Sequence, residues 1–366
     1  MRRIWLLVLV SALAVTFSSW GKKKKEEQTE VLQLPKELPT AVTAETRRLV
    51  FQVTPLSSKG LLSQQTREAL KWLLHARRGT VVKLRAFVAG SGDLRRVRDI
   101  VSDTFTEHKQ PLPVLSVVQV GALPMESAQV VFESTEQAKR PAKDFGLVYI
   151  SGQGISGTQI SEPVLPLAKQ SMARVATAVE AARSQPGDVV RVTCFLSSLG
   201  QYSDIQQLVQ SNYPAAALNL VQVLRSPSHA MAECEAVARL KWNPGTAIHM
   251  LNPEGLGQSS QVSQIALISA PAVILTGSQE AFGFQDADAR LAFERLNKSL
   301  SQEGGSLRQV AFTSLYPLST SISRQVRKIR EEFYDKERPP AGTMLPFQGL
   351  PSMDSGFALD VVGVKE

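Results

Sequence analysis

The chain has 366 residues, 43% hydrophobic and 20% charged, which is an ordinary composition for a globular protein with room for more than one core. Its net charge of +8 includes the lysine run at 22–25, and the remaining excess is scattered along the chain. A basic tail therefore explains most of the charge, which does not indicate a nucleic-acid-binding protein. We therefore expect no nucleic-acid partner.

Residues 1–20 have the pattern of an export segment. Two arginines precede an uncharged apolar stretch, and small serines follow it. A cleaved signal peptide and an N-terminal anchor both fit, because the lysines at 22–25 resemble a stop signal. We expect an exported protein, periplasmic or secreted, with a membrane tether through the N-terminus as the alternative. Residues 21–45 predict a charged flexible linker.

The clearest pattern lies in residues 186–240. Val190, Val192, Cys194 and Leu196 alternate with other residues, which predicts a half-buried strand with these four side chains on one face. A helix that closes at Pro214 and two further apolar strands follow it.

This order of elements occurs three times, about 100 residues apart, which indicates tandem repeats. We place the repeats at 46–138 (with a degenerate start), 144–243 and 262–366, with a linker at 244–261 and the strand QIALISA opening the third. The first helix of each repeat is expected to bury residues spaced by four, three and four: Leu62, Thr66, Ala69 and Leu73; Ala168, Met172, Val175 and Val179; Ala289, Phe293, Leu296 and Leu300. In the third repeat the second helix is expected to run past Phe333, to Pro339 and Pro340. Phe87, Phe195 and Phe312 are taken as equivalent residues that pack the sheets together.

Cys194 and Cys234 both fall in predicted strands of the second repeat. Such a pair either forms a disulfide in an exported protein or consists of two small core residues. We favour two core residues.

The second repeat resembles the RidA/YjgF superfamily of reactive-intermediate imine/enamine deaminases. The resemblance rests on SGQ at 151–153, VVRVTCFL at 189–196, NLVQVLRSP at 219–227 and AECEAVARL at 232–240. It extends well to the first repeat and more distantly to the third. It implies an α+β fold of three chorismate mutase-like units, each a six-stranded mixed sheet packed on two helices. Members are usually homotrimers with clefts between subunits, so one chain with three units is expected to be a monomer that closes into an intramolecular pseudo-trimer.

Active members carry an arginine that binds the substrate carboxylate and a glutamate that positions water. The arginine position holds Leu115, Leu218 (or Ala216 in a second alignment) and Gly342, and the glutamate position holds Val131, Glu233 and Ala358. The next position facing the same way is acidic in every repeat, at Glu133, Glu235 and Asp360. A leucine cannot replace a bidentate guanidinium contact.

The resemblance therefore implies a divergent small-molecule binding protein, not an enzyme, with Ser151, Gly152, Gln153, Leu218 and Gly342 as candidate ligand-binding residues. The alternatives are a deaminase hydrolysing 2-iminobutanoate or 2-iminopropanoate, with Glu233 as its catalytic residue, and a structural scaffold.

Two other sites are disfavoured. Gly152, Gly154 and Gly157 match a dinucleotide fingerprint, but Pro163 and Pro166 prevent a helix from starting at the third glycine. The four histidines are dispersed, so we expect no metal and no cofactor.

Overall fold

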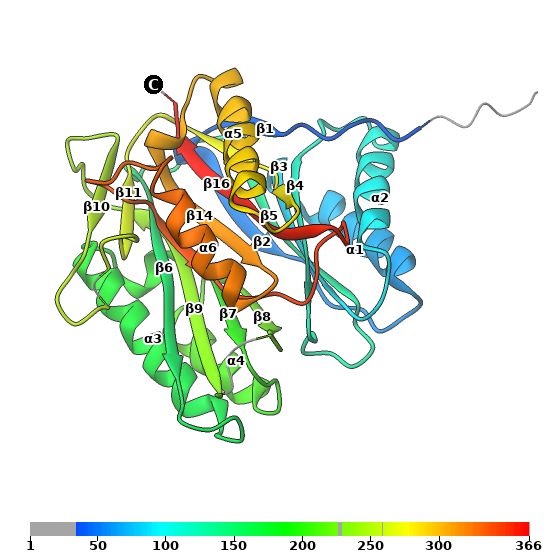
Figure 1. Ribbon diagram of the computed structural model, residues 1–366, viewed down its shortest axis with the longest axis horizontal. Helices are drawn as coiled ribbons and strands as arrows, with labels where there is room; N and C mark the ends of the chain where they lie inside the picture. Colours follow the sequence, from blue (N-terminus) through cyan, green and yellow to red (C-terminus); the bar gives the residue numbers. More distant parts are fainter. Residues whose placement is uncertain (1–33, 226–228, 258, 366) are drawn as a thin grey trace, which may run out of the picture. The chain divides into compact units, whose positions relative to one another are not determined.

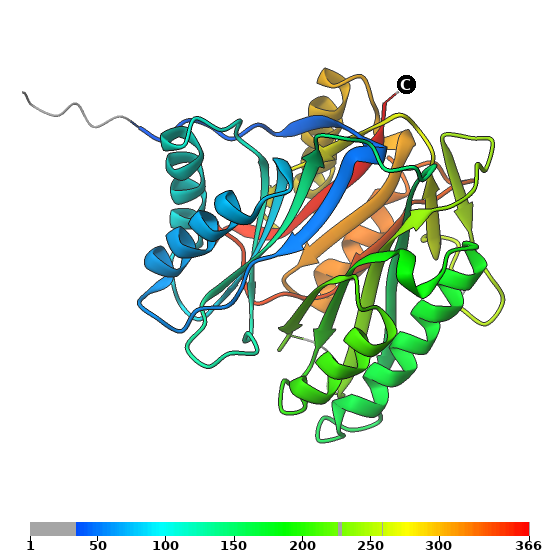
Figure 2. The same cartoon turned by 180° about the vertical axis from the view of Figure 1, so that it is seen from behind.

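The computed structural model describes residues 34–225, 229–257 and 259–365, and one compact unit begins at Pro35. In this part of the chain the fold is α+β, with three separate mixed sheets and six α-helices (Figures 1 and 2). The predicted signal or anchor at 1–20 and the start of the linker lie outside the described residues. Within them, no helix is both long and apolar enough to cross a membrane.

Sheet 1 has the strand order β2-β5-β3-β4 and packs on helices α1 and α2. These elements are β2 (Leu49–Val53), α1 (Leu62–Ala76), β3 (Gly79–Ala89), α2 (Leu94–Glu107), β4 (Val114–Val120) and β5 (Val130–Ala138), and a 3-10 helix, η1 (Thr46–Arg48), precedes them. β4 runs parallel to β3, and the other pairs are antiparallel.

Sheet 2 has the order β10-β11-β6-β9-β7-β8 and packs on α3 and α4. Its elements are β6 (Gly146–Ser156), α3 (Val164–Ala181), η2 (Pro186–Asp188), β7 (Val189–Leu196), α4 (Tyr202–Asn212), β8 (Ala217–Gln222), β9 (Met231–Leu240), β10 (Ile248–Leu251) and β11 (Ile265–Ile268).

Sheet 3 has the order β1-β12-β16-β14-β15, with β13 also on β16, and packs on α5 and α6. Its elements are β1 (Ala41–Glu45), β12 (Ala272–Thr276), β13 (Gln279–Phe282), α5 (Asp286–Gln302), η3 (Leu307–Gln309), β14 (Val310–Pro317), α6 (Thr320–Arg330), β15 (Ala341–Met344) and β16 (Ser355–Val364).

Two strands join sheets to which the sequence does not assign them. The prediction that residues 41–45 belong to the charged flexible linker is wrong, because they form β1 and bury Ala41 and Ala44. β1 pairs with β12 of sheet 3, and β11, the strand within QIALISA, pairs with β6 of sheet 2. The segment expected as a linker contributes β10, which extends sheet 2. Sheets 2 and 3 therefore have six strands and sheet 1 has four, so the six-strand expectation is wrong for sheet 1.

The physical reason lies at the outer edge of β2. The residues just before β6 contain Pro141 and form no strand, so they cannot extend sheet 1 as β11 extends sheet 2. Instead, the Ala142 N–H donates to the Arg47 carbonyl at 2.7 Å, and Arg239 Nη2 donates to the Leu49 carbonyl at 2.8 Å. These contacts occupy backbone groups that an edge strand would otherwise leave open.

All three central strands carry a β-bulge at the same point. The register shifts between Val81 and Lys83 in β3, between Val189 and Arg191 in β7, and between Val310 and Phe312 in β14. A bulge inserts one residue, so side chains before it change face. Val190 consequently packs in the core between the sheets, although strict alternation predicted it on the helix side with Val192.

The predicted buried faces of α1, α3 and α5 are confirmed, since every residue named for them is buried. The predicted extent of α6 is wrong. This helix ends at Arg330, and the N–H groups of Phe333 and Tyr334 both bond to the Arg330 carbonyl in a terminal turn.

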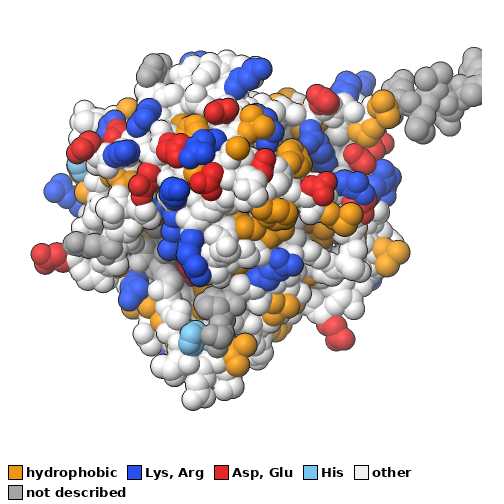
Figure 3. Space-filling model, viewed as in Figure 1, with side chains coloured by type: hydrophobic (Ala, Val, Ile, Leu, Met, Phe, Trp, Pro, Cys, Tyr) orange, Lys and Arg blue, Asp and Glu red, His pale blue; other side chains and the backbone are white. Residues whose placement is uncertain are grey.

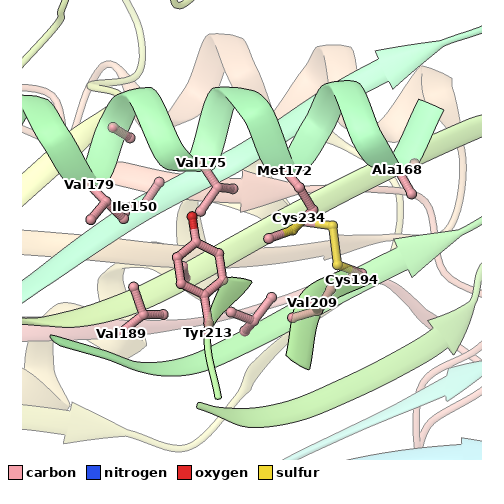
Figure 4. Close-up of a cluster of buried hydrophobic side chains, with 14 of the residues drawn as sticks. Ile150, Ala168, Met172, Val175, Val179, Val189, Cys194, Val209, Tyr213 and Cys234 are labelled. Atoms are coloured by element: carbon pink, nitrogen blue, oxygen red, sulfur yellow. A yellow bond between two sulfur atoms is a disulfide. The ribbon is translucent and has the colours of Figure 1, made fainter. Parts of the chain in front are cut away.

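The two cysteines form a disulfide, so the preference for two unlinked core residues is wrong. Cys194 of β7 and Cys234 of β9 are direct cross-strand partners, a pairing that the sequence alone could not establish. Figure 4 shows the bridge beneath α3, near Met172 and Val175.

The inner faces of all three sheets meet in two shared apolar cores. In one of them the Phe87 and Phe195 ring centroids lie 6.1 Å apart. The third equivalent is Tyr316, not Phe312, because Tyr316 faces Ala358 as Phe87 faces Val131. Phe312 lies four residues earlier and packs on Tyr149 in the other core, with centroids 5.2 Å apart.

Candidate functional site

The candidate glutamate positions are structurally equivalent. In each sheet the residue lies on the last long strand, opposite an aromatic residue of the central strand. The pairs are Phe87 with Val131, Phe195 with Glu233, and Tyr316 with Ala358. Only sheet 2 therefore presents a carboxylate at this position.

The candidate arginine positions are also equivalent. Each lies on the short strand parallel to the central one, in the pairs Leu84 with Leu115, Val192 with Leu218, and Thr313 with Gly342. At Gly342 a Cβ atom would lie 2.4 Å from the Thr313 carbonyl oxygen, so any side chain there requires the backbone to shift. None of the three positions offers a guanidinium.

Sheets 2 and 3 meet at a junction formed by Ser151, Glu233 and Gly342, the Glu233 junction. Ser151 Oγ accepts a hydrogen bond from the Gly342 N–H at 2.8 Å and donates to the Ser263 carbonyl at 2.6 Å. Gln153 Nε2 donates to Gln264 Oε1 at 2.9 Å. Two of the candidate ligand-binding residues, Ser151 and Gln153, are thus buried and already bonded to protein groups.

Glu233 lies over Gly152, where a Cβ atom would be 2.0 Å from its Oε1. The absence of a side chain at Gly152 is therefore what leaves room for the carboxylate. Burial, followed by the charge of Glu235, raises the pKa of Glu233 to about 8, although Arg327 acts in the opposite direction. Figure 3 shows Lys and Arg side chains gathered over α6, the helix that contains Arg327.

An arginine-lined cavity of about 370 Å³ lies between sheets 1 and 3. Leu115 lines it, together with Arg95 and Arg98 of α2. Two carboxylates, Asp99 and Glu280, also border it, so charges of both signs face the space.

A neutral cavity of about 380 Å³ lies between sheets 1 and 2. Leu218 and Val131 line it, and its polar lining is uncharged: Thr54, Tyr202, Gln206, Gln210 and Asn219. Both cavities fall within the usual volume range of small-molecule sites. Leu218 thus lines a cavity, whereas Ser151, Gly152, Gln153 and Gly342 lie together at the Glu233 junction.

A central ion cluster lies where the three inner faces converge. Its members are the cations Lys83, Arg85 and Arg191 and the carboxylates Glu133, Glu235 and Asp360. Arg85 Nη2 lies 2.6 Å from both Glu133 Oε2 and Glu235 Oε1, and Lys83 bonds to Asp360.

Each carboxylate of the cluster also accepts a hydrogen bond from an equivalent residue of another sheet. Those residues directly follow the three arginine positions. The bonds run from Ser116 to Asp360 at 2.7 Å, from Asn219 to Glu133 at 2.8 Å and from Thr343 to Glu235 at 2.5 Å. The contacts therefore form a closed cycle around the three sheets.

The cluster lowers the pKa values of Glu133 and Asp360. Burial alone would raise the pKa of Glu133, but Arg85 and Arg191 outweigh it and hold that pKa below its ordinary value. The pKa of Asp360 is also held below its ordinary value, chiefly by Lys83. Burial lowers the pKa of Lys83 itself.

Sequence reasoning identified the three acidic positions but not their partners. The available signal was a charged residue on the inner face of a central strand, at Lys83, Arg85 and Arg191. Among the described residues, no group of three or more His, Cys, Asp and Glu side chains is arranged to hold a metal ion.

The sequence model of the family described as Endoribonuclease L-PSP matches residues 140–240. No curated protein matches the chain. A Rid-family protein of unknown function from Yersinia pestis is 15% identical over 32% of this chain and 99% of its own, with a TM-score of 0.29. A YjgF-family protein from Mycobacterium tuberculosis is 20% identical over 32% and 98%, with a TM-score of 0.24. The YjgF gene product of Escherichia coli is 28% identical over 25% and 80%, with a TM-score of 0.23.

Proposed function

We propose that residues 140–240, which the family model matches, form one of three RidA-like repeats closed into a pseudo-trimer, and that the chain binds small molecules in the cavities between these repeats. One observation carries the proposal: two cavities of about 370 and 380 Å³ border equivalent leucines, Leu115 and Leu218, where active relatives carry an arginine. The space for a ligand has been kept while the anchor for a carboxylate has been lost.

The cyclic hydrogen bonds of the central ion cluster support the pseudo-trimer. Ser116, Asn219 and Thr343 occupy the same register position on equivalent strands, and each donates to a carboxylate of the next sheet around the cycle. Three identical subunits around an axis would make the same set of contacts.

The chemistry of the lining favours an uncharged ligand in the neutral cavity. No ionisable group other than the phenol of Tyr202 lines it, so a carboxylate would lose its hydration without gaining a charged partner there. An apolar ligand with one or two hydrogen-bonding groups matches the leucine, valine and glutamine side chains.

Imine hydrolysis is the second candidate, and Glu233 favours it. A carboxyl group with a pKa of about 8 is largely protonated at neutral pH and can donate a proton to a bound imine; the carboxylate that remains can then accept a proton from the attacking water. Gly342 opposes this candidate, because the backbone at Thr313 leaves no room for a substrate-binding arginine in the same junction.

The buried disulfide supports export, since such bonds form and persist in oxidising compartments. Cytosolic maturation would leave Cys194 and Cys234 reduced within an apolar core. Mass spectrometry of the native protein under alkylation tests this part of the proposal: the pair is expected to be oxidised.

Indole is a suitable neutral probe for the neutral cavity. Isothermal titration is expected to show saturable binding to the wild-type chain, at least tenfold weaker in Leu218→Trp because the larger side chain fills the space. Leu291→Trp is the matched control, since Leu291 is exposed on α5 and is expected to leave the affinity unchanged. If indole bound equally to both variants, or not at all, the binding proposal would fail and a scaffold role would replace it.

A further inference from the structure

The charges of the central ion cluster are distributed unequally among the three sheets. Sheet 1 contributes Lys83, Arg85 and Glu133, and therefore a net positive charge. Sheet 2 contributes Arg191 and Glu235, which balance each other. Sheet 3 contributes Asp360 alone, because Phe312 and Ser314 occupy the positions that hold cations in sheet 1.

The cluster has little access to water that could screen an imbalance: the side chain of Arg191 is 11% exposed, and the cavity among the cluster residues measures only about 20 Å³. Lys83, Arg85, Glu133, Glu235 and Asp360 are each at most 8% exposed. All six oxygens of the three carboxylates accept at least one hydrogen bond, from the three cations or from neighbouring hydroxyl and amide groups. An unpaired charge in such a place is strongly destabilising.

We propose that the central ion cluster is an assembly code, by which the inner face of sheet 1 accepts sheet 3 and rejects a second copy of itself. Three copies of the sheet 1 face would bring six cations against three carboxylates, and three copies of the sheet 3 face would bring carboxylates with no cation. Faces of sheets 1 and 3 give a neutral cluster only in equal numbers, as when one copy of each is present. The face of sheet 2 is balanced by itself and adds no preference.

The partner that this surface fits is therefore the third repeat of the same chain. The code directs closure within one chain over association between chains. The inference rests on the three-repeat closure proposed above but not on ligand binding, so indole titration and the experiment below can fail independently.

The test compares two double variants of the full chain at the pair that joins sheets 1 and 3. Lys83→Gln with Asp360→Asn keeps a hydrogen-bonding pair but removes both charges, so sheets 1 and 3 each become neutral. Lys83→Asp with Asp360→Lys reverses the charges and keeps the two faces complementary. Ser116 and Tyr316, which donate to Asp360, have hydroxyl groups that can also accept.

Each protein is unfolded, refolded at high concentration and analysed by size exclusion with light scattering. The wild type and the charge-reversed pair are expected to return as monomers. The neutral pair is expected to fold, because a buried ion pair is replaceable by neutral groups, but with at least a twofold lower monomer fraction and a matching rise in oligomers.

A single Lys83→Asp variant places two carboxylates side by side and is expected to lower the ratio of folded to unfolded protein on the order of a hundredfold. The proposal is overturned if the neutral pair refolds to monomer as completely as the wild type. It is equally overturned if the charge-reversed pair fails to fold, or yields no more monomer than the neutral pair.

Discussion

The central ion cluster and the aligned glutamate and arginine positions, here called the cleft positions, differ in how alike they are among the three sheets. At the centre, Ser116, Asn219 and Thr343 make the same hydrogen bond in all three sheets. At the positions aligned with the family's glutamate and arginine, sheet 2 has Glu233, and the three sheets have Leu115, Leu218 and Gly342; Leu115 and Leu218 each border a cavity.

This difference separates two kinds of constraint. A buried polar group that loses its partner destabilises the whole fold, so the central contacts are hard to change one at a time. A cleft residue faces open space and can change without unfolding the protein. The central contacts therefore indicate how the chain assembles, and the residues at the cleft positions indicate which chemistry each sheet can support.

The largest loss of stability is expected from a substitution in the central ion cluster. Arg85→Met removes the guanidinium that bonds both Glu133 and Glu235, leaving two buried carboxylates short of a partner. We expect a loss of about 3–5 kcal/mol in the free energy of unfolding, measured by urea titration. Arg96→Met is the matched control on the exposed face of α2, where its ion pair with Asp99 at 3.6 Å contributes less than about 1 kcal/mol. Equal losses in the two variants would contradict a special role for the centre.

Removing the disulfide tests how much this bond stabilises sheet 2, which contains Glu233. Cys194→Ala with Cys234→Ala opens a loop with a sequence separation of 40 and is expected to cost about 2–4 kcal/mol, chiefly by freeing the unfolded chain. Urea unfolding of this variant should match that of the wild type in excess reductant, where the bond breaks once the chain opens. If excess reductant did not change the urea unfolding of the wild type, the disulfide would not be present in the folded protein.

A smaller effect is expected at the Glu233 junction. Gly342→Ala places a methyl group against the Thr313 backbone and should cost about 1–3 kcal/mol of stability by overpacking. Leu218→Ala, at the equivalent position beside a cavity, is the comparison and should cost less than a fully buried leucine. If Gly342→Ala were as stable as the wild type, an arginine could be accommodated there after all.

The smallest effect is a change in pH dependence. Because the pKa of Glu233 is raised to about 8, the folded chain holds a proton between pH 4.5 and 8 that the unfolded chain releases. Stability should therefore fall as pH rises through this window, and Glu233→Gln should remove that slope.

The acid side of the same profile provides an internal control. Glu133 and Asp360 have lowered pKa values, so their contribution is present above their ordinary pKa range and is lost as pH falls below it. Glu233→Gln should leave this loss unchanged. A variant that alters the acid side but not the neutral slope would contradict the assignment to Glu233.

Residue patterns predicted the local structure well. Helix faces such as Ala168, Met172 and Val175 follow from spacing alone, because an apolar stripe must be buried against another element of the fold. The equivalence of Leu115, Leu218 and Gly342 also follows from counting along the repeats, and the strand pairing agrees with it.

Long-range pairing could not be predicted in the same way. Which sheets β1 and β11 join depends on which sheet edges have unpaired backbone groups. A single bulge places Val190 on the face opposite to the one that strict alternation predicts. Tyr316 was missed because a tyrosine replaces phenylalanine at its position. Some partners of Glu133, Glu235 and Asp360 lie in other sheets, namely Thr193, Arg85 and Lys83 respectively, so no local spacing could reveal these contacts.

Hydrolysis of 2-iminobutanoate by the chain lacking residues 1–20 tests most directly whether this is a binding protein on an enzyme's fold. With no arginine at Leu115, Leu218 or Gly342, we predict the same rate as in buffer, for the wild type and for Glu233→Gln alike. Turnover by the wild type that disappears in Glu233→Gln would contradict the account, because another group would then hold the substrate carboxylate beside Glu233.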